Sequence, residues 1–192
     1  MPNPTPFPAP ADDLRLVVYD MDGTLLDGDG NIPSQLWPLL ETMRDRAIAF
    51  VPASGRQCTT LSTMFGSHLQ GMPIIAENGT YVVRDGVDIS SSTIDPNLTR
   101  EVITGVRQLR NDGHDVGLVV ATKSIAYLER GDDPFVSHVA TYYHSHRIVK
   151  DLSEHTDDVI KLSIYDFREA SEATYPTMQR TAPEHQVILA TP

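Results

Sequence analysis

The stretch "LRLVVYDMDGTLLDGDG", residues 14–30, decides the fold, because an apolar run ends in two acidic residues where the chain has to turn. The nearly continuous apolar run before Asp20 is typical of a central strand that is covered on both faces. Asp22 follows two residues later, Gly23 lets the backbone turn, and Thr24 offers a hydroxyl. We therefore expect both carboxylates to face one crevice at the carboxyl end of the strand.

The composition indicates a globular protein that folds without cross-links. The chain has 192 residues, of which 40% are apolar, and this suits one large domain or two small ones. Its single cysteine, Cys58, excludes an intramolecular disulfide. The formal charge of −11, without a basic stripe, argues against a nucleic-acid partner. The N-terminal residues do not resemble a signal peptide, and no run approaches the roughly 18 to 20 apolar residues that cross a bilayer, so we expect a cytoplasmic protein without membrane contact.

The pattern along the chain predicts an α/β protein with two domains after a tail. Prolines at alternate positions favour an extended, disordered tail over residues 1–12. Short apolar strands then alternate with amphipathic helices, which is typical of a layered domain with a parallel sheet, over residues 13–90. Its elements are expected as strands over 15–19, 47–52 and 73–76, helices over 33–46 and through Leu61 to Leu69, and a hairpin around Asp85-Gly86.

A linker near residues 90–96 leads to the second domain, residues 91–192. Its strands are expected over 116–121, 124–128, 147–150, 159–165 and 186–190, and its helices over 96–110, 134–144 and 168–181. We expect one antiparallel or mixed sheet with helices on one face.

Three strand ends of the first domain carry polar sequences: "DMDGT", "ASGR" and "ENG". Two carboxylates as close as those of Asp20 and Asp22 repel each other unless a cation lies between them, and Mg²⁺ prefers such oxygen ligands. One carboxylate could then attack an electrophile while the other donates and accepts a proton. Ser54 in "ASGR" could cap the following helix, bind an anion at its N-terminus, or do both.

These residues carry a resemblance to a known superfamily. "DMDGTLL" resembles the first motif of the haloacid dehalogenase (HAD) superfamily, D-x-D-x-T-[LV], and Ser54 resembles the Ser/Thr of its second motif. The order of the strand-end motifs, the hairpin and an inserted α/β segment is similar to the Cof-type branch, which has a C2B cap. The resemblance implies a three-layer Rossmann-like core followed by an α/β cap domain. It also implies a phosphatase for a small phosphorylated metabolite, such as a sugar phosphate or a cofactor- or nucleotide-like phosphate.

The resemblance assigns roles to single residues. Asp20 would be the nucleophile that forms an aspartyl-phosphate and would also bind Mg²⁺. Asp22 would be the general acid and base, with its backbone carbonyl on the metal. The phosphate and substrate would be bound by Gly23, Thr24, Ser54, Gly55 and Arg56, the last lying near the phosphate or a cap contact.

The pattern of the family continues beyond the cap with a third-motif lysine and a fourth motif, G-D-x-x-N-D, and the chain ends at Pro192 before either. We therefore expect an incomplete core with an open sheet edge that favours self-association. The alternative to the enzyme is a catalytically incompetent fragment that acts as a binding or interaction protein. A receiver-like phospho-acceptor is a third interpretation, and the segment after residue 96 argues against it.

Other polar residues have simpler interpretations. We expect Glu77 and Asn78 to shape a loop, the histidines of "YYHSHR" to be surface residues, and Cys58 to be a packed thiol. Lys161 is expected as a surface or edge lysine of a cap strand, with a position facing the substrate cleft as the alternative, and for Arg56 the alternative to a phosphate contact is a solvated charge in the first turn of a helix.

Overall fold

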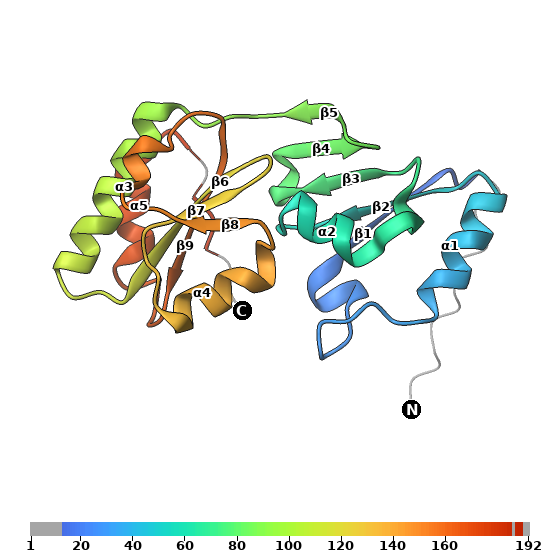
Figure 1. Cartoon of the computed structure of the whole chain (residues 1–192), viewed down its shortest axis with the longest axis horizontal. Coiled ribbons are helices and arrows are strands. Elements are labelled where there is room, and N and C mark those ends of the chain that lie inside the picture. Colours follow the sequence, from blue (N-terminus) through green and yellow to red (C-terminus); the bar gives the residue numbers. More distant parts are fainter. Residues whose placement is uncertain (1–12, 186, 190–192) are drawn as a thin grey trace, which may run out of the picture.

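The chain folds into two lobes, each built on one sheet, and a single crossing leads from β5 to α3 between them (Figure 1). The computed structural model describes residues 13–185 and 187–189. We call residues 13–91 the first lobe and the described residues from 92 onward the second lobe. The predicted α/β class is confirmed.

The first lobe brings the carboxyl ends of three parallel strands to one edge of its sheet. The strands follow the order β1 (Leu16–Asp20), β2 (Ala49–Ala53), β3 (Pro73–Ala76), β4 (Tyr81–Arg84) and β5 (Val87–Ser91). Asp20 lies opposite Ala53, and Ala53 lies opposite Ile75. The chain therefore leaves β1, β2 and β3 at neighbouring points.

Two helices cover one face of this sheet. Helix α1 (Leu36–Asp45) begins three residues later than expected, and α2 (Cys58–Phe65) continues as the 3₁₀ helix η2 (Gly66–Leu69). Pro38 is tolerated because it lies in the first turn of α1, where backbone N–H groups have no helical acceptor. The central buried side chains of this layer include those of Met21, Leu40, Phe50, Leu61 and Phe65.

The expectation that the first strand is covered on both faces is wrong. In the described sheet β1 is the edge strand, and it pairs with β2 alone. Successive strand residues face opposite sides, so Val17 and Tyr19 pack into the core beneath the helices. Leu16 and Val18 face the other side and are about half exposed, at 52% and 50%.

The predicted hairpin is confirmed. β4 and β5 pair antiparallel, and Arg84 lies opposite Val87. Asp85 and Gly86 both have positive φ, 51° and 76°, as a type I′ turn requires. The chain then runs through residues 92–95 to the next helix, so the expected linker over residues 90–96 is shorter by three residues.

The second lobe has the mixed sheet that the sequence predicts. Its elements are α3 (Pro96–Asn111), β6 (Val116–Thr122), β7 (Ala126–Leu128), α4 (Asp133–Tyr142), β8 (His146–Ile148), β9 (Val159–Asp166) and α5 (Thr174–Thr181). The strand order is β8-β7-β6-β9, with β7 and β8 parallel and the other pairs antiparallel.

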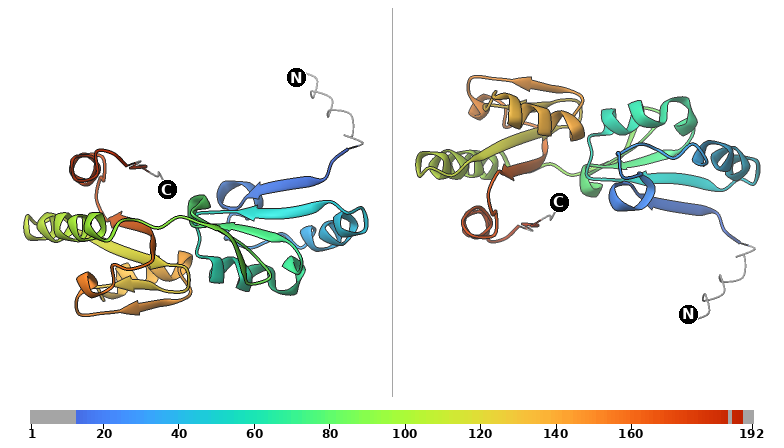
Figure 2. Two further views of the ribbon diagram at one scale, coloured as in Figure 1. Left: turned by 90° about the horizontal axis from the view of Figure 1, so that it is seen from above. Right: turned by 90° about the horizontal axis from the view of Figure 1, so that it is seen from below.

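Helices cover both faces of this sheet, so the expectation of one covered face is wrong. Leu118 and Val120 of β6 pack with α3 and α5, whereas Val119 and Ala121 pack with α4. The views from above and below show α5 and α4 on opposite sides of the strands (Figure 2). The physical reason is that β6 is buried along nearly its whole length, because both sets of alternating side chains are apolar.

The last helix is shorter than expected. Helix α5 begins at Thr174, because residues 168–173 form turns instead of the predicted first part of the helix. The expected tail, residues 1–12, and the ends of the expected last strand, residues 186 and 190, lie outside the described residues; residues 187–189 are not in a strand. Within the described part of the chain no helix is long and apolar enough to cross a membrane.

Candidate active site

The turn after β1 presents two carboxylates with different partners. Asp20 ends the strand with an exposed side chain, and the Thr24 hydroxyl donates a hydrogen bond of 3.3 Å to its Oδ2. Gly23 has φ +73°, a conformation that costs a glycine little, so the chain can reverse directly behind Asp22. Met21 between the acids is fully buried and anchors the turn to the core.

The loop after β2, residues 54–56, lies beside this turn and is nearly buried. Ser54 donates its N–H to the carbonyl of Ile75 at 3.0 Å, and its hydroxyl oxygen accepts the N–H of Arg56 at 3.1 Å. The hydroxyl therefore closes a turn within the loop. The expected helix cap at Ser54 is wrong, since α2 begins at Cys58 with Gln57 at its N-cap position.

Arg56 connects the acidic turn to the second lobe. Its guanidinium donates to both carboxylate oxygens of Asp22, with Nη2 to Oδ1 at 2.6 Å and Nε to Oδ2 at 3.2 Å. Its third donor, Nη1, binds the carbonyl of Thr141 at the end of α4 at 2.7 Å, and the ring of Tyr142 lies 5.1 Å from the guanidinium carbon. A bidentate pair of this kind fixes the plane of the Asp22 carboxylate. Of the two positions predicted for Arg56, the structure shows the contact with the second segment.

The third strand end, "ENG", supports the loop from behind. Its residues form the short 3₁₀ turn η3 (Glu77–Gly79). The N–H groups of Glu77 and Asn78 donate to the carbonyls of Arg56 and Ser54, both at 3.1 Å. A Cβ atom at Gly55 would lie 2.5 Å from Oδ1 of Asn78, so a larger residue at position 55 would displace the Asn78 side chain. The predicted site residues on the first two strand ends are thus brought together, with the third strand end as their support.

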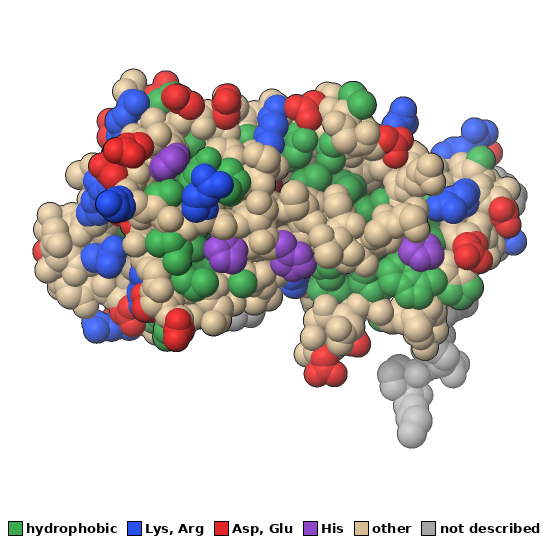
Figure 3. Space-filling view, viewed as in Figure 1, with side chains coloured by type: hydrophobic (Ala, Val, Ile, Leu, Met, Phe, Trp, Pro, Cys, Tyr) green, Lys and Arg blue, Asp and Glu red, His purple; other side chains and the backbone are tan. Residues whose placement is uncertain are grey.

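The second lobe docks beside this loop through buried polar side chains of the first. Gln57 is fully buried and exchanges two hydrogen bonds with the backbone of Ser145, at 3.0 and 2.9 Å. Thr60 donates to the carbonyl of Tyr142 at 3.0 Å. On the face shown in Figure 3, charged side chains are spread over both lobes, while the junction between them carries mainly histidine and uncharged side chains. The polar residues Gln57 and Thr60 at the start of α2 are the signal in the sequence that could have indicated this contact.

The acidic turn suits a hard cation with few protein ligands. No group of three or more His, Cys, Asp or Glu side chains among the described residues could hold a metal ion. The exposed Asp20 carboxylate nevertheless keeps free acceptor positions, whereas Arg56 occupies both oxygens of Asp22. Mg²⁺ is commonly bound through one or two carboxylates together with waters and substrate phosphate. The free acceptor positions of Asp20 are therefore of the kind that Mg²⁺ prefers.

The remaining polar candidates separate into confirmed and corrected predictions. Burial raises the pKa of the Cys58 thiol, which agrees with a packed thiol. Of the histidines in "YYHSHR", His144 is exposed as expected, whereas His146 is half-buried, with its Nδ1 2.8 Å from the carbonyl oxygen of Tyr143. Lys161 lies on β9, an edge strand of the described sheet, as one of its expected positions required. Its side chain is not at the surface but largely buried at the junction of the lobes, where it faces Glu77 of the first lobe.

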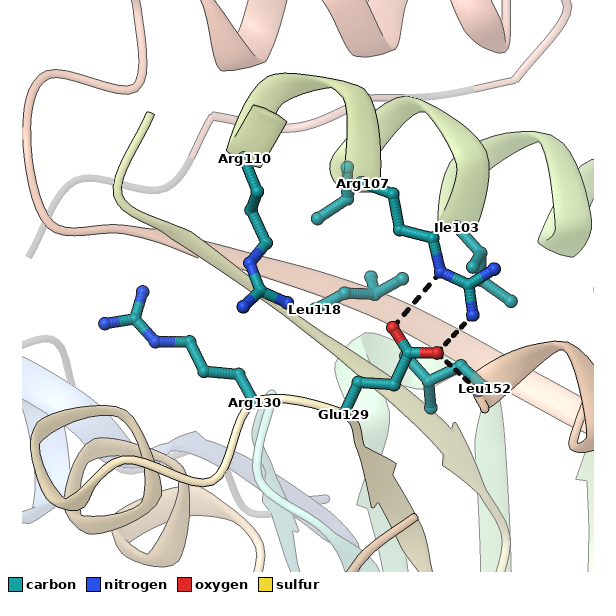
Figure 4. A pocket seen from close by; sticks show the side chains of 8 residues that line it. Ile103, Arg107, Arg110, Leu118, Glu129, Arg130 and Leu152 are labelled. Carbon is teal, nitrogen blue, oxygen red and sulfur yellow. Dashed lines mark hydrogen bonds and ion pairs between the residues drawn. The ribbon is translucent and has the colours of Figure 1, made fainter. Parts of the chain in front are cut away.

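Two hollows lie away from the acidic turn. One, of about 490 Å³, lies between α2, η2 and the β4–β5 hairpin and is bordered by Lys123 of the second lobe. The other lies in the second lobe beside Arg107, whose guanidinium binds the carboxylate of Glu129 (Figure 4). Its volume of about 10 Å³ admits roughly one water molecule, too little for a ligand.

Comparisons with known proteins agree with this geometry. A family model described as haloacid dehalogenase-like hydrolase matches residues 17–190. YbjI of Escherichia coli (strain K12), a 5-amino-6-(5-phospho-D-ribitylamino)uracil phosphatase, is 25% identical over 173 residues, which cover 89% of this chain and 61% of YbjI. Among solved structures, a haloacid dehalogenase-like hydrolase from Bacteroides thetaiotaomicron has a TM-score of 0.69 at 19% identity, over 88% of this chain and 63% of that one. A protein from Thermotoga maritima has a TM-score of 0.70 at 21% identity, over 89% and 63%. The chain thus spans about three fifths of the length of these relatives.

Proposed function

Because the chain belongs to the haloacid dehalogenase-like hydrolase family, we propose that it acts as a Mg²⁺-dependent phosphatase on small phosphorylated metabolites. The observation that carries this proposal is the meeting of Asp20 and Asp22 with the buried loop of Ser54 and Arg56. The second lobe serves as the cap in this proposal. Its contacts with Arg56 and Gln57 support that role, because they close one side of the site.

Asp20 acts as the nucleophile in the first step. An oxygen of its carboxylate attacks phosphorus and forms an aspartyl-phosphate, while the bond from phosphorus to the ester oxygen breaks. Asp22, in its protonated form, gives its proton to that oxygen, so the product leaves as an alcohol. The carboxylate of Asp22 must exchange one of its bonds to Arg56 to take up and deliver this proton.

The second step restores both side chains. A water molecule attacks phosphorus and gives a proton to the Asp22 carboxylate, the bond between phosphorus and the Asp20 oxygen breaks, and inorganic phosphate leaves. The Ser54 hydroxyl and the N–H of Gly55 hold the phosphoryl oxygens throughout, together with Gly23, Thr24 and Arg56, and the N–H of Arg56 positions the Ser54 hydroxyl. Phosphoryl transfer depends mainly on this kind of positioning and neutralisation of charge.

Asp20 and the backbone of Asp22 would hold the metal ion. When it is bound, Mg²⁺ supplies positive charge that offsets the repulsion between the carboxylates and the phosphate.

The substrate class is drawn from the site and from the relatives. YbjI carries the name of a phosphatase for a phosphorylated ribitylamino-pyrimidine, which is a cofactor-like phosphate monoester. We extend this to sugar phosphates and to cofactor- or nucleotide-like phosphates for the present chain, and we place its activity in the cytoplasm.

The test measures the release of inorganic phosphate from a panel of phosphate monoesters, with Mg²⁺ and with a chelator. Asp20→Asn should lower the rate by roughly 10⁴-fold or more, as expected for a lost nucleophile. Asp29→Asn is the matched control, because Asp29 is an exposed acid of the same segment, and it should retain the rate of the unmodified chain. Release that survives Asp20→Asn, or no release from any ester, would refute the proposal.

A further inference from the structure

Glu77 is a buried acid whose burial the proposed chemistry does not explain. It is 1% exposed, and neither carboxylate oxygen accepts a hydrogen bond from the described residues. Burial raises the pKa of this carboxyl, and nearby Lys161 offsets the effect only in part. Glu77 and Asn78 also have positive φ, 53° and 58°, which is uncommon for residues other than glycine. Strain and buried charge together at one turn point to a specific partner.

That partner comes from the other lobe. Lys161 lies on β9, and its ammonium is 3.2 Å from Oε2 of Glu77. The same ammonium donates a hydrogen bond of 2.5 Å to the carbonyl of Gly55 and lies 5.4 Å from the centre of the Tyr143 ring. Tyr143 is itself buried, and its hydroxyl oxygen forms a hydrogen bond of 3.1 Å with Oγ of Ser163. Lys161 therefore joins β9 to two strand ends of the first lobe.

The bond to Gly55 has a direct consequence for the candidate active site. The carbonyl of Gly55 and the N–H of Arg56 belong to one planar peptide unit, so a group that fixes the carbonyl also fixes the direction of the N–H. The turn at Glu77 already holds the carbonyls on either side, those of Ser54 and Arg56. Lys161 holds the one between them, and it does so from the second lobe.

We propose that Lys161 is a positioning residue, which orients the Gly55–Arg56 peptide of the phosphoryl-binding loop only while the second lobe is seated on the first, with Glu77 as its buried counter-charge. This inference rests on the proposed function for the role of the loop. It adds that cap closure and the orientation of the loop are one event, because a single ammonium takes part in both. Glu77 favours the seated arrangement, because the Lys161 ammonium is the counter-charge of its buried carboxylate there.

Hydrogen exchange of the 192-residue chain tests the inference without any need for turnover. The reporters are the amides of Arg56, Glu77 and Asn78, which bond within or to the loop. Lys161→Met keeps the length of the side chain but removes the donor, and these amides should exchange about 10- to 100-fold faster, the effect of losing a hydrogen bond to a charged group. The matched control is Lys123→Met, which breaks the other lysine contact between the lobes, with Asp88 at 2.6 Å, away from the loop.

A double variant separates positioning from simple neutralisation of charge. Glu77→Gln together with Lys161→Met removes both charges of the buried pair, so the thermal stability of the double variant should recover toward that of the unmodified chain. The Arg56 amide should still exchange fast, because the Gly55 carbonyl lacks its donor. Recovery of the unmodified exchange rate in this variant would overturn the inference, and so would equal acceleration by Lys123→Met.

Kinetics distinguish this inference from the proposed function. Lys161→Met should lower kcat for phosphate release and change KM less, whereas fast exchange with an unchanged kcat would overturn the positioning role. Release that persists in Asp20→Asn would refute the proposed function alone, and the exchange result would still decide whether Lys161 orients the loop.

Discussion

Substitution of Arg56 by lysine tests whether the orientation of Asp22 matters for the reaction. Lysine keeps the charge but cannot donate to both oxygens of Asp22 and to the Thr141 carbonyl at once. The Asp22 side chain is 52% exposed, so solvent screening limits the lost pair to about 1 kcal/mol. The lost bond to Thr141 adds about 1 kcal/mol. We therefore expect a loss of about 2 kcal/mol in the free energy of unfolding.

The functional effect of Arg56→Lys should exceed what this loss of stability explains. General acid and base catalysis contributes roughly 10²- to 10⁴-fold to a rate, and an Asp22 carboxylate that turns freely loses part of it. We expect kcat for phosphate release to fall by about 10- to 100-fold, at a temperature where the variant is folded. Urea unfolding measures the stability, and phosphate release on the best ester of the panel measures the rate.

Arg130→Lys is the matched control. The Arg130 side chain is also mostly buried, at 14% exposure, and binds two aspartates, Asp115 and Asp132, in the second lobe away from the acidic turn. It should lose similar stability and keep its kcat. The reasoning fails if Arg56→Lys retains the kcat of this control, or if freeing Asp22 makes the enzyme faster.

Three further predictions concern packing and titration. Gly117→Ala should lower the free energy of unfolding by about 1 to 3 kcal/mol, because its Cβ would lie 2.3 Å from the buried ring of Phe135. Gly105→Ala is the control, since its Cβ would meet only the flexible end of the Met178 side chain, at 3.0 Å, and an equal loss of stability in this variant would contradict the argument. Burial raises the pKa of Cys58, so at pH 8.5 iodoacetamide should alkylate it more slowly in the folded chain than in urea, and equal rates would refute this. Burial lowers the pKa of His138, so the unfolded chain binds more protons than the folded chain, and the free energy of unfolding should fall as the pH drops from about 6.5 toward the folded pKa. In urea titrations at several pH values, His138→Gln should remove that part of the fall, and an unchanged pH profile would exclude a contribution from His138.

Local signals in the sequence predicted the elements that depend on neighbouring residues alone. The strand over 73–76 and the Asp85-Gly86 hairpin agree with the structure residue by residue, because a β-branched run and a turn that needs positive φ are local properties. The convergence of "DMDGT" and "ASGR" followed from the rule that parallel strands end at one edge. The start of α5 was misplaced, since nothing in the pattern between residues 168 and 173 distinguishes turns from a first helical turn.

Local sequence signals could not predict most contacts between the lobes, because these contacts depend on how the two sheets are placed relative to each other. The burial of β1 on one face only could not be read from its apolar run, which suits a strand covered on one face or on both. The resemblance placed Arg56 near a phosphate or at a contact with the cap, and the residues alone also allowed a solvated charge. Its partner across the junction is the backbone carbonyl of Thr141, which no side-chain pattern reveals.

The contact between Lys161 and Glu77 joins two charged residues that both stand in apolar stretches of the sequence. Lys161 stands in "VIKLSIYD", where Ile160 and Leu162 face the opposite side of the strand, so a lysine that keeps its charge there requires an anion close by only if its own face is covered too. Glu77 directly follows the apolar strand "PIIA" in a turn that leads into another strand, so it too is an acid in an apolar setting. Neither residue alone indicates a contact, but a buried cation and a buried anion in different domains each require a counter-charge, and each can be the counter-charge of the other. In the structure the two lobes meet at these residues, with 3.2 Å between Lys161 Nζ and Glu77 Oε2.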